Sequence, residues 1–244
     1  MNVGSLFSGI GGLELGLERA GMQTIWQAEI DPYASRVLAK HWPAVPNLGD
    51  ISRVDWDTVE RPDLICGGFP CQPWSVAGRR LGTADERWLW PEFARCVRHL
   101  RPDYVLVENV PGLLVGGLGD VLGGLAEMGF DADWACLPAA AVGAPHLRWR
   151  VFVLAYAGGK GLQGLYQAGR RIDLQSAPPD LRRQWSAEPN LVRVANGLPY
   201  RVDGRIPRTK AVGNAVVPQV AEWIGRHIMT SAHIDGADDD HSEV

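Results

Sequence analysis

One of the four cysteines stands where a reactive thiol could act. Cys71 lies in the run Gly67-Gly68-Phe69-Pro70-Cys71-Gln72-Pro73-Trp74-Ser75, directly after an apolar segment typical of a buried strand. Glycines and prolines restrict the backbone of this run, so we expect Cys71 on a shaped loop at the end of the strand. The other three cysteines, Cys66, Cys96 and Cys136, lie in apolar contexts that suit inert packing. Cys71 is therefore the candidate nucleophile.

A carboxylate occupies a matching position after the next strand-like segment. Glu108 ends the apolar run 104–107 and precedes Asn109. Because the carboxyl ends of adjacent parallel strands meet at one sheet edge, we expect Glu108 beside Cys71. A carboxylate at the end of a buried strand is expected either to have hydrogen-bond or charge partners or to have a functional role. Glu108 alone could also be a helix-capping or ion-paired residue, and its pairing with Cys71 favours an acid–base role.

A glycine turn near the N-terminus could hold a nucleotide-like ligand. The apolar run 3–7 is followed by Ser8-Gly9-Ile10-Gly11-Gly12 and then by a helical pattern, so bare backbone N–H groups are expected at a helix N-terminus. Glu29 ends the second apolar run, where a carboxylate can accept hydrogen bonds from ribose hydroxyls. Asp50 could accept a hydrogen bond from an adenine amino group, although each acid could also be an ordinary turn or surface residue. Glu14 replaces the third glycine of the dinucleotide pattern, which disfavours NAD.

Alternating strands and helices would bring these residues to one edge. The apolar runs that predict strands are 3–7, 24–28, 63–66, 104–107 and 150–155. The helical patterns are 13–20, 32–40 with Asp31 as N-cap, 86–99, 121–128 and 216–229. We therefore predict an α/β fold with a Rossmann-like, doubly wound, mostly parallel sheet and a ligand site at the carboxyl ends of its strands.

Changes in composition divide the chain into four expected parts. Residues 1–156 are predicted to form a catalytic and cofactor-binding domain, and 208–232 to return to it. Between them, 157–207 is rich in proline, glycine and basic residues and is expected to be a small irregular insertion for target recognition. Residues 233–244 are expected to be an acidic, disordered tail.

The charge distribution points to a polyanionic partner. The chain has 244 residues and a net charge of −4, yet 143–210 contains twelve lysines and arginines against four acids, a net charge of +8. A basic segment on an acidic body predicts a surface for DNA, although it could also be a solvated face. We expect Arg170, Arg171, Arg182 and Arg183 to face phosphates.

Composition also limits the class of protein. No apolar run is long enough to span a bilayer, the N-terminus lacks the pattern of a signal peptide, and the cysteines have neither disulfide nor metal-site spacing. We therefore expect a cytoplasmic protein, monomeric in solution, with no membrane association and no metal.

In order along the chain, these segments resemble the cytosine-5 DNA methyltransferases of bacteria and phages. The matching elements are 7–12 as the S-adenosylmethionine loop, Glu29 as the ribose acid, Asp50 as the adenine contact, Pro70-Cys71-Gln72 as the nucleophile motif, Glu108-Asn109-Val110 as the E-N-V element, 143–150 as the G-x-P-Q-x-R-x-R element and 213–218 as the closing motif. His146 stands where the family usually has glutamine. About 60 residues separate the last strand from Gly213, fewer than the family's recognition region usually has.

The resemblance implies a class I methyltransferase that uses S-adenosylmethionine on double-stranded DNA. Cys71 would add to carbon 6 of a flipped-out cytosine, Glu108 would donate a proton or hydrogen bond at N3, Arg150 would bind O2, and Arg148 would support the pocket. The expected cofactor residues are Phe7, Ser8, Gly9, Gly11, Gly12, Leu13, Glu29, Ile30, Asp50, Ile51, Gly68, Pro70, Leu89, Asn214 and Val216. The expected DNA residues are Gln72, Ser75, Arg79, Arg80, Arg170, Arg171, Arg182 and Arg183.

Other functions stay open at this point. A tRNA cytosine-5 methyltransferase shares the P-C-Q and E-N-V motifs, and a catalytically silent DNA-binding protein is possible if the short insertion cannot position a base. An NAD-dependent oxidoreductase would leave both Cys71 and Glu108 unexplained. The resemblance favours DNA modification, in a restriction-modification system or between phage and host, and the target sequence is not predicted.

Overall fold

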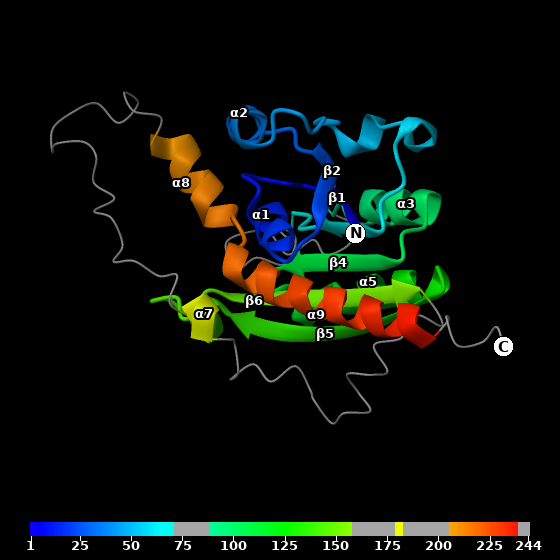
Figure 1. The fold of residues 1–244 in the computed structure, drawn as a ribbon. Helices are drawn as coiled ribbons and strands as arrows, with labels where there is room; N and C mark the ends of the chain where they lie inside the picture. Colours follow the sequence, from blue (N-terminus) through cyan, green and yellow to red (C-terminus); the bar gives the residue numbers. More distant parts are fainter. Residues whose placement is uncertain (71–87, 158–178, 183–204, 239–244) are drawn as a thin grey trace, which may run out of the picture.

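A six-stranded mixed sheet forms the centre of the molecule (Figure 1). The computed structural model describes residues 1–70, 88–157, 179–182 and 205–238. The strand order is β2-β1-β3-β4-β6-β5. The strands are β1 (Asn2–Leu6), β2 (Gln23–Ala28), β3 (Leu64–Gly67), β4 (Tyr104–Asn109), β5 (Phe130–Pro138) and β6 (Trp149–Ala157). Strands β1 to β4 are parallel, β6 is antiparallel to β4, and β5 is antiparallel to β6.

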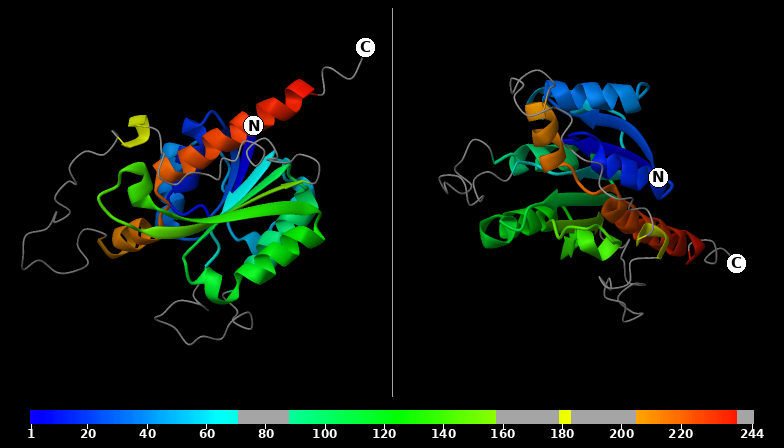
Figure 2. Two further views of the ribbon diagram at one scale, coloured as in Figure 1. Left: turned by 90° about the horizontal axis from the view of Figure 1, so that it is seen from below. Right: turned by 90° about the vertical axis from the view of Figure 1, so that its left-hand side faces the viewer.

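Helices cover both faces of this sheet, as Figure 2 shows. Helices α1 (Gly12–Arg19) and α9 (Pro218–Asp238) lie on one face, and α3 (Trp90–Leu100) and α5 (Leu118–Glu127) lie on the other. The remaining described helices are α2 (Pro32–His41), α4 (Leu113–Gly116), α7 (Pro179–Arg182) and α8 (Arg205–Asn214), with the 3-10 turns η1 (Ile51–Arg53), η2 (Trp56–Thr58) and η5 (Ala139–Val142). The predicted α/β, doubly wound, mostly parallel fold is confirmed.

The central strands are apolar because both of their faces are covered. In β4, Val105 and Val107 belong to the cluster shared with α3 and α5, whereas Tyr104 and Leu106 belong to the cluster shared with α1 and α9. Successive side chains of a strand point to opposite faces, so a strand covered on both sides appears in the sequence as a continuous apolar run. This is why the runs at 3–7, 24–28, 63–66 and 104–107 predicted strands correctly.

Two helix starts fix the backbone next to the sheet's carboxyl edge. The Asp31 carboxylate accepts hydrogen bonds from the amides of Tyr33 at 2.9 Å and Ala34 at 3.2 Å, so α2 begins at Pro32 as predicted. The turn between β1 and α1 has positive φ at Phe7 (54°), Gly9 (58°) and Gly11 (85°). Glycine tolerates this conformation, which accounts for the glycines of the turn.

Several element boundaries differ from the predictions. Trp88 and Leu89 are not helical, so the described part of the 86–99 pattern begins its helix at Trp90. Strand β5 was not predicted, because Asp131 and Asp133 interrupt its apolar pattern at the sheet edge. Helix α8 was not predicted either, and it extends from the expected insertion 157–207 into the region after it.

The tail prediction was wrong for its first six residues. Helix α9 continues to Asp238, so 233–238 is helical rather than disordered. Once a helix has formed, each further residue adds a hydrogen bond, and no proline follows Pro218 to stop it. The other domain boundaries remain predictions.

The described helices do not include one that is both long enough and apolar enough to cross a membrane. Nor do the described residues contain a cluster of three or more His, Cys, Asp or Glu side chains that could hold a metal ion.

Candidate active site

An open cleft of about 590 Å³ lies at the carboxyl edge of the sheet. Its walls come from the segments after β1, β2, β3 and β4, from the start of β6, and from α8 with the residues that follow it. A cavity of this size suits a nucleotide-sized ligand. The position agrees with the rule that doubly wound sheets bind ligands outside the carboxyl ends of their strands.

The glycine turn and β2 hold one carboxylate in the cleft. The Glu29 carboxylate accepts a hydrogen bond from the Gly9 amide at 2.7 Å through Oε2, and from the Asp31 amide at 2.6 Å through Oε1. These bonds fix the side chain where the turn and α2 meet. Each oxygen keeps a further lone pair, so Glu29 can still accept hydrogen bonds from a ligand's hydroxyl groups.

The side of the cleft around η1 combines a capping acid with apolar side chains. Asp50 Oδ1 accepts hydrogen bonds from the Ser52 amide at 3.0 Å and the Ser52 hydroxyl at 2.7 Å. Ile51 and Leu89 line the same cleft, and the Ile30 side chain is 69% exposed beside it. An exposed isoleucine in a cleft offers an apolar surface to a flat ligand ring.

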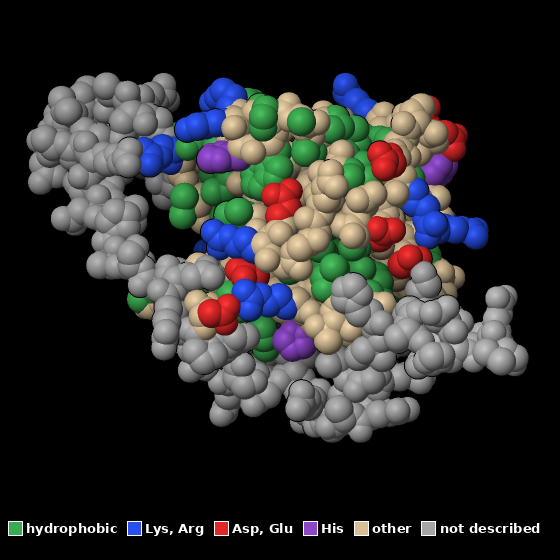
Figure 3. All heavy atoms as spheres, in the orientation of Figure 1, with side chains coloured by type: hydrophobic (Ala, Val, Ile, Leu, Met, Phe, Trp, Pro, Cys, Tyr) green, Lys and Arg blue, Asp and Glu red, His purple; other side chains and the backbone are tan. Residues whose placement is uncertain are grey.

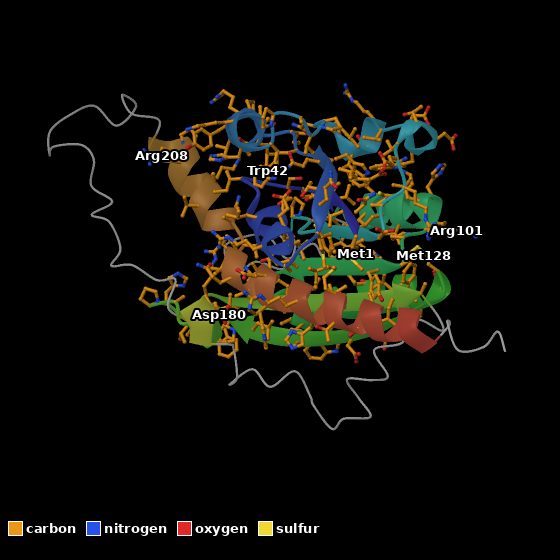
Figure 4. All side chains as sticks on the ribbon, in the orientation of Figure 1. Met1, Trp42, Arg101, Met128, Asp180 and Arg208 are labelled. Atoms are coloured by element: carbon orange, nitrogen blue, oxygen red, sulfur yellow. The ribbon has the colours of Figure 1, made fainter. Side chains whose placement is uncertain are left out.

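Close backbone approach shapes the wall opposite the glycine turn. A Cβ atom on Gly12 would lie 2.5 Å from the carbonyl oxygen of Val216, so this position requires glycine. Gly11 does not line the cleft, because it faces Trp42: a Cβ atom there would lie 2.3 Å from the indole ring. Gly11 therefore packs against Trp42, which Figure 4 shows between α2 and α1, and its expected role as a cofactor contact remains a prediction.

A buried acid–arginine pair occupies the other half of the cleft. Arg150 Nε lies 2.9 Å from Glu108 Oε1, and Glu108 is only 7% exposed. Burial raises the pKa of Glu108 to about 7, although the positive charges of Arg150 and Arg148 oppose this shift. A carboxyl group in this state can be protonated at neutral pH and donate a hydrogen bond.

The segment that leads to Cys71 passes directly over Glu108. Gly67 pairs with Val107 in the parallel register of β3 and β4, and a Cβ atom on Gly68 would lie 2.6 Å from Glu108 Oε2. The prediction that these two strand ends lie side by side is confirmed. Cys71 itself follows three residues later, outside the described residues.

Most of the expected site residues line this one cleft. Those that do are Phe7, Ser8, Gly9, Gly12, Leu13, Glu29, Ile30, Asp50, Ile51, Gly68, Pro70, Leu89, Glu108, Arg150, Asn214 and Val216. Gly11 and Arg148 do not. Arg148 instead donates two hydrogen bonds from Nη2, to the carbonyl oxygens of Gly213 at 2.7 Å and Ala215 at 2.5 Å.

The expected DNA contacts lie outside the described residues, apart from the backbone of Arg182. Gln72, Ser75, Arg79, Arg80, Arg170, Arg171 and Arg183 lie outside the described residues, as does Cys71. The backbone of Arg182 ends helix α7, and its side chain lies outside the described part of the chain. These assignments remain predictions.

Comparison with known proteins identifies the family. The family model described as C-5 cytosine-specific DNA methylase matches residues 1–184. The chain belongs to this methylase family. The resemblance of its motifs is therefore confirmed over most of the chain.

Curated methylases share part of their length with this chain. The Type II methyltransferase M.Eco47II of Escherichia coli is 43% identical over 122 residues, which cover 48% of this chain and 29% of the relative. The Type II methyltransferase M.HhaI of Haemophilus parahaemolyticus is 31% identical over 181 residues, covering 72% of this chain and 55% of the relative. The chain thus spans about half the length, or less, of these relatives.

Solved structures agree with the methylase fold. A putative DNA modification methyltransferase encoded within an E. coli prophage has a TM-score of 0.54 and 31% identity, covering 64% of this chain and 47% of that one. A variant of Spodoptera frugiperda DNMT2 has a TM-score of 0.55 and 25% identity, covering 65% and 50%. Each similarity covers about two thirds of this chain.

Sequence reasoning missed the contribution of α8 to this methylase cleft. Pro207, Lys210 and Ala211 line it, and Lys210 Nζ lies 3.1 Å from Asp31 Oδ2 across its mouth. The closing motif 213–218 was the available signal, since the segment before it had to approach the same wall. The weak apolar pattern of α8 gave no separate indication of a helix.

Proposed function

We propose that this chain is a DNA cytosine-5 methyltransferase that moves a methyl group from S-adenosylmethionine to carbon 5 of cytosine in double-stranded DNA. The observation that carries the proposal is the shared cleft: Glu29 and the glycine turn line one part of it, and the buried Glu108–Arg150 pair lines another. A group-transfer enzyme needs a donor site and an acceptor site in contact.

The residues in the part of the cleft lined by Glu29 and the glycine turn fit S-adenosylmethionine, which supplies an electrophilic methyl group when bound. Glu29 is available to accept hydrogen bonds from ribose hydroxyls, and Ile30 and Leu89 offer apolar surface to an adenine ring. The backbone of the turn after β1 lies at the N-terminus of α1, and Gly9, where a side chain would point into open space, leaves room for close approach.

The part of the cleft lined by Glu108 and Arg150 fits the polar edge of a cytosine. Protonated Glu108 would donate a proton or hydrogen bond to N3, and Arg150 would donate a hydrogen bond to O2, so both groups would stabilise the negative charge that develops when a nucleophile adds to the ring. The Cys71 thiolate would form a bond to carbon 6, which makes carbon 5 nucleophilic toward the methyl group. Loss of the proton from carbon 5 would then break the bond to Cys71 and restore the ring.

The other cysteines support this choice of nucleophile. Cys66 and Cys96 are fully buried, and burial raises the pKa of both thiols and of Cys136. Thiols of this kind are poor nucleophiles, because the thiolate is the reactive form. Cys71 follows the segment at Gly67 and Gly68 that crosses Glu108, so its place in the chain suits attack on a base bound there.

The DNA partner is proposed from charge as well as from the family. Figure 3 shows Lys and Arg side chains over α2 and α8, and these helices carry the exposed residues Arg36, Lys40, Arg208 and Lys210, of which Lys210 lines the cleft. A cytosine inside a duplex cannot be reached from both faces of its ring, so the base must leave the helix to enter the cleft. The Type II methyltransferase names of the relatives support a role in restriction-modification.

Covalent trapping tests the nucleophile directly. DNA containing 5-fluorocytosine lacks the proton that must leave carbon 5, so with S-adenosylmethionine the wild-type protein should form a stable complex that survives denaturing electrophoresis. Cys71→Ser should bind the cofactor and form no complex, whereas Cys136→Ser should trap normally. Trapping by Cys71→Ser would assign the nucleophile to another residue and contradict the proposal.

A further inference from the structure

Arg148 is placed differently from its neighbour Arg150, although both belong to the same motif. Arg150 lines the cleft and pairs with Glu108, whereas Arg148 is absent from the cleft lining. The Arg148 backbone has a φ of 37°, a left-handed conformation that is unusual for a residue with a side chain. A residue keeps such a conformation when the surrounding structure requires it. The contacts of the Arg148 side chain therefore indicate the structural role of this residue.

Those contacts cap a helix. Arg148 Nη2 donates to the carbonyl oxygens of Gly213, in the last turn of α8, and of Ala215, just after it. The last carbonyls of a helix have no intrahelical partner, and the negative end of the helix dipole lies there, so a cation that donates to them is favourable. Burial lowers the pKa of Arg148, but a guanidinium stays charged at neutral pH.

The capped segment is one wall of the proposed cofactor site. Asn214, Ala215 and Val216 line the cleft, and the Val216 carbonyl lies against Gly12 at the start of α1. Lys210, on the same helix and also in the cleft lining, pairs with Asp31. Helix α8 is therefore held by the partly buried Arg148 side chain at its C-terminus and by an exposed ion pair near its middle.

We propose that Arg148 is a positioning residue for the cofactor wall: it caps α8 and holds 213–216 against the glycine turn. It acts on cofactor binding before any base is present, while Arg150 acts on the base. This inference rests on the proposed function, because it takes the ligand of the wall to be S-adenosylmethionine.

Cofactor binding without DNA separates these roles. Isothermal titration of S-adenosylhomocysteine should show affinity about 10-fold or more weaker for Arg148→Met than for wild type, since this variant removes two charge-assisted hydrogen bonds to the wall. Arg148→Lys should recover part of the affinity, because it keeps the charge but not the forked donors. Arg98→Met removes an exposed arginine from α3 and should bind like wild type.

Steady-state kinetics supply a second readout. Arg148→Lys should raise KM for S-adenosylmethionine with a small change in kcat, whereas a residue that contacts the base would lower kcat. If Arg148→Met does not fold, Arg148→Lys decides the question by the same titration. Wild-type affinity in the Arg148 variants would overturn the inference and leave the proposed function intact. Failure of the wild-type protein to bind the cofactor would overturn both.

Discussion

The carboxyl group of Glu108 lies between Gly68 and Arg150, and its burial decides its protonation state. With a pKa raised to about 7, a large fraction of Glu108 is protonated at neutral pH, where an exposed glutamate would be almost fully ionised. The neighbouring arginines limit the shift without removing it. Glu108 can therefore donate a hydrogen bond to a base and still exchange its proton near physiological pH.

The first prediction follows from this protonation state. Glu108→Gln should keep the fold and cofactor affinity but lower the methylation rate by roughly 10² or more, since the amide can donate a hydrogen bond but not a proton. In wild type the contribution of Glu108 should be complete below its pKa and should decline as pH rises through about 7. Single-turnover rates between pH 6 and 9 measure this.

The same pH series contains its own control. The decline should be absent in Glu108→Gln, because the amide does not titrate, and any remaining pH dependence should come from other groups such as the nucleophile. An unchanged methylation rate in Glu108→Gln would contradict the acid–base role and would show that Glu108 is only a structural ion-pair partner of Arg150.

The sequence predicted polar site residues at the carboxyl ends of buried strands. Glu29 and Glu108 could be assigned to the site because strand ends in a parallel sheet meet at one edge. Gly11 and Arg148 share motifs with true lining residues, yet Gly11 packs on Trp42 and Arg148 caps α8. A motif places a residue near a site, but the groups that the residue contacts there depend on tertiary packing.

At the scale of the elements, the close packing of helices α1 and α9 depends on a glycine, Gly16. A Cβ atom on Gly16 would lie 2.3 Å from the Pro218 carbonyl oxygen and 2.5 Å from Ala221 Cβ. The backbones of the two helices thus approach closely next to the wall formed by 213–216. Their separation helps to fix where Val216 meets Gly12.

A matched pair of substitutions tests this packing. Gly16→Ala should lower the free energy of unfolding by about 1–3 kcal/mol, because backbone cannot move away as a flexible side chain can. Gly123→Ala places the same methyl group on α5 where no atom beyond the helix's own backbone lies within 4 Å, and should stabilise the protein by up to about 1 kcal/mol through helix propensity. Chemical denaturation measures both, and equal effects would show that the α1–α9 contact is not tight.

Element prediction failed where tertiary contacts replace local pattern. Strand β5 is held by its pairing with β6, and α8 by Arg148 and Lys210, and neither has a strong apolar period of its own. The central strands and α2 were predictable because burial on both faces and the Asp31 cap leave clear signals in the sequence.

At the scale of the whole molecule, an acidic protein is proposed to bind a polyanion. The net charge is −4, so binding must depend on where the basic residues lie. The proposed phosphate contacts Arg170, Arg171, Arg182 and Arg183 belong to the basic segment. Exposed Lys210 lines the cleft, and exposed Arg208 lies on the same helix, α8 (Figure 4).

Salt dependence measures this distribution. Replacing Arg170, Arg171, Arg182 and Arg183 with alanine should weaken duplex binding at low salt and flatten the slope of log K against log salt, by about 0.9 for each phosphate that the protein no longer neutralises. Cofactor affinity and target preference should change little, because phosphate contacts position the protein and base contacts specify the sequence. An identical slope would make these arginines a solvated face and move the DNA surface toward Arg79, Arg80 and 201–210.

The identity of the methylated atom tests the central claim most directly. The protein is incubated with S-adenosylmethionine carrying a labelled methyl group and with either duplex DNA or tRNA, and the products are digested to nucleosides and separated. We predict label in 5-methyl-2′-deoxycytidine from DNA, dependent on Cys71. Label in tRNA alone, label in a methylated amino group of adenine or cytosine, or no transfer by a protein that binds the cofactor would contradict the proposed function.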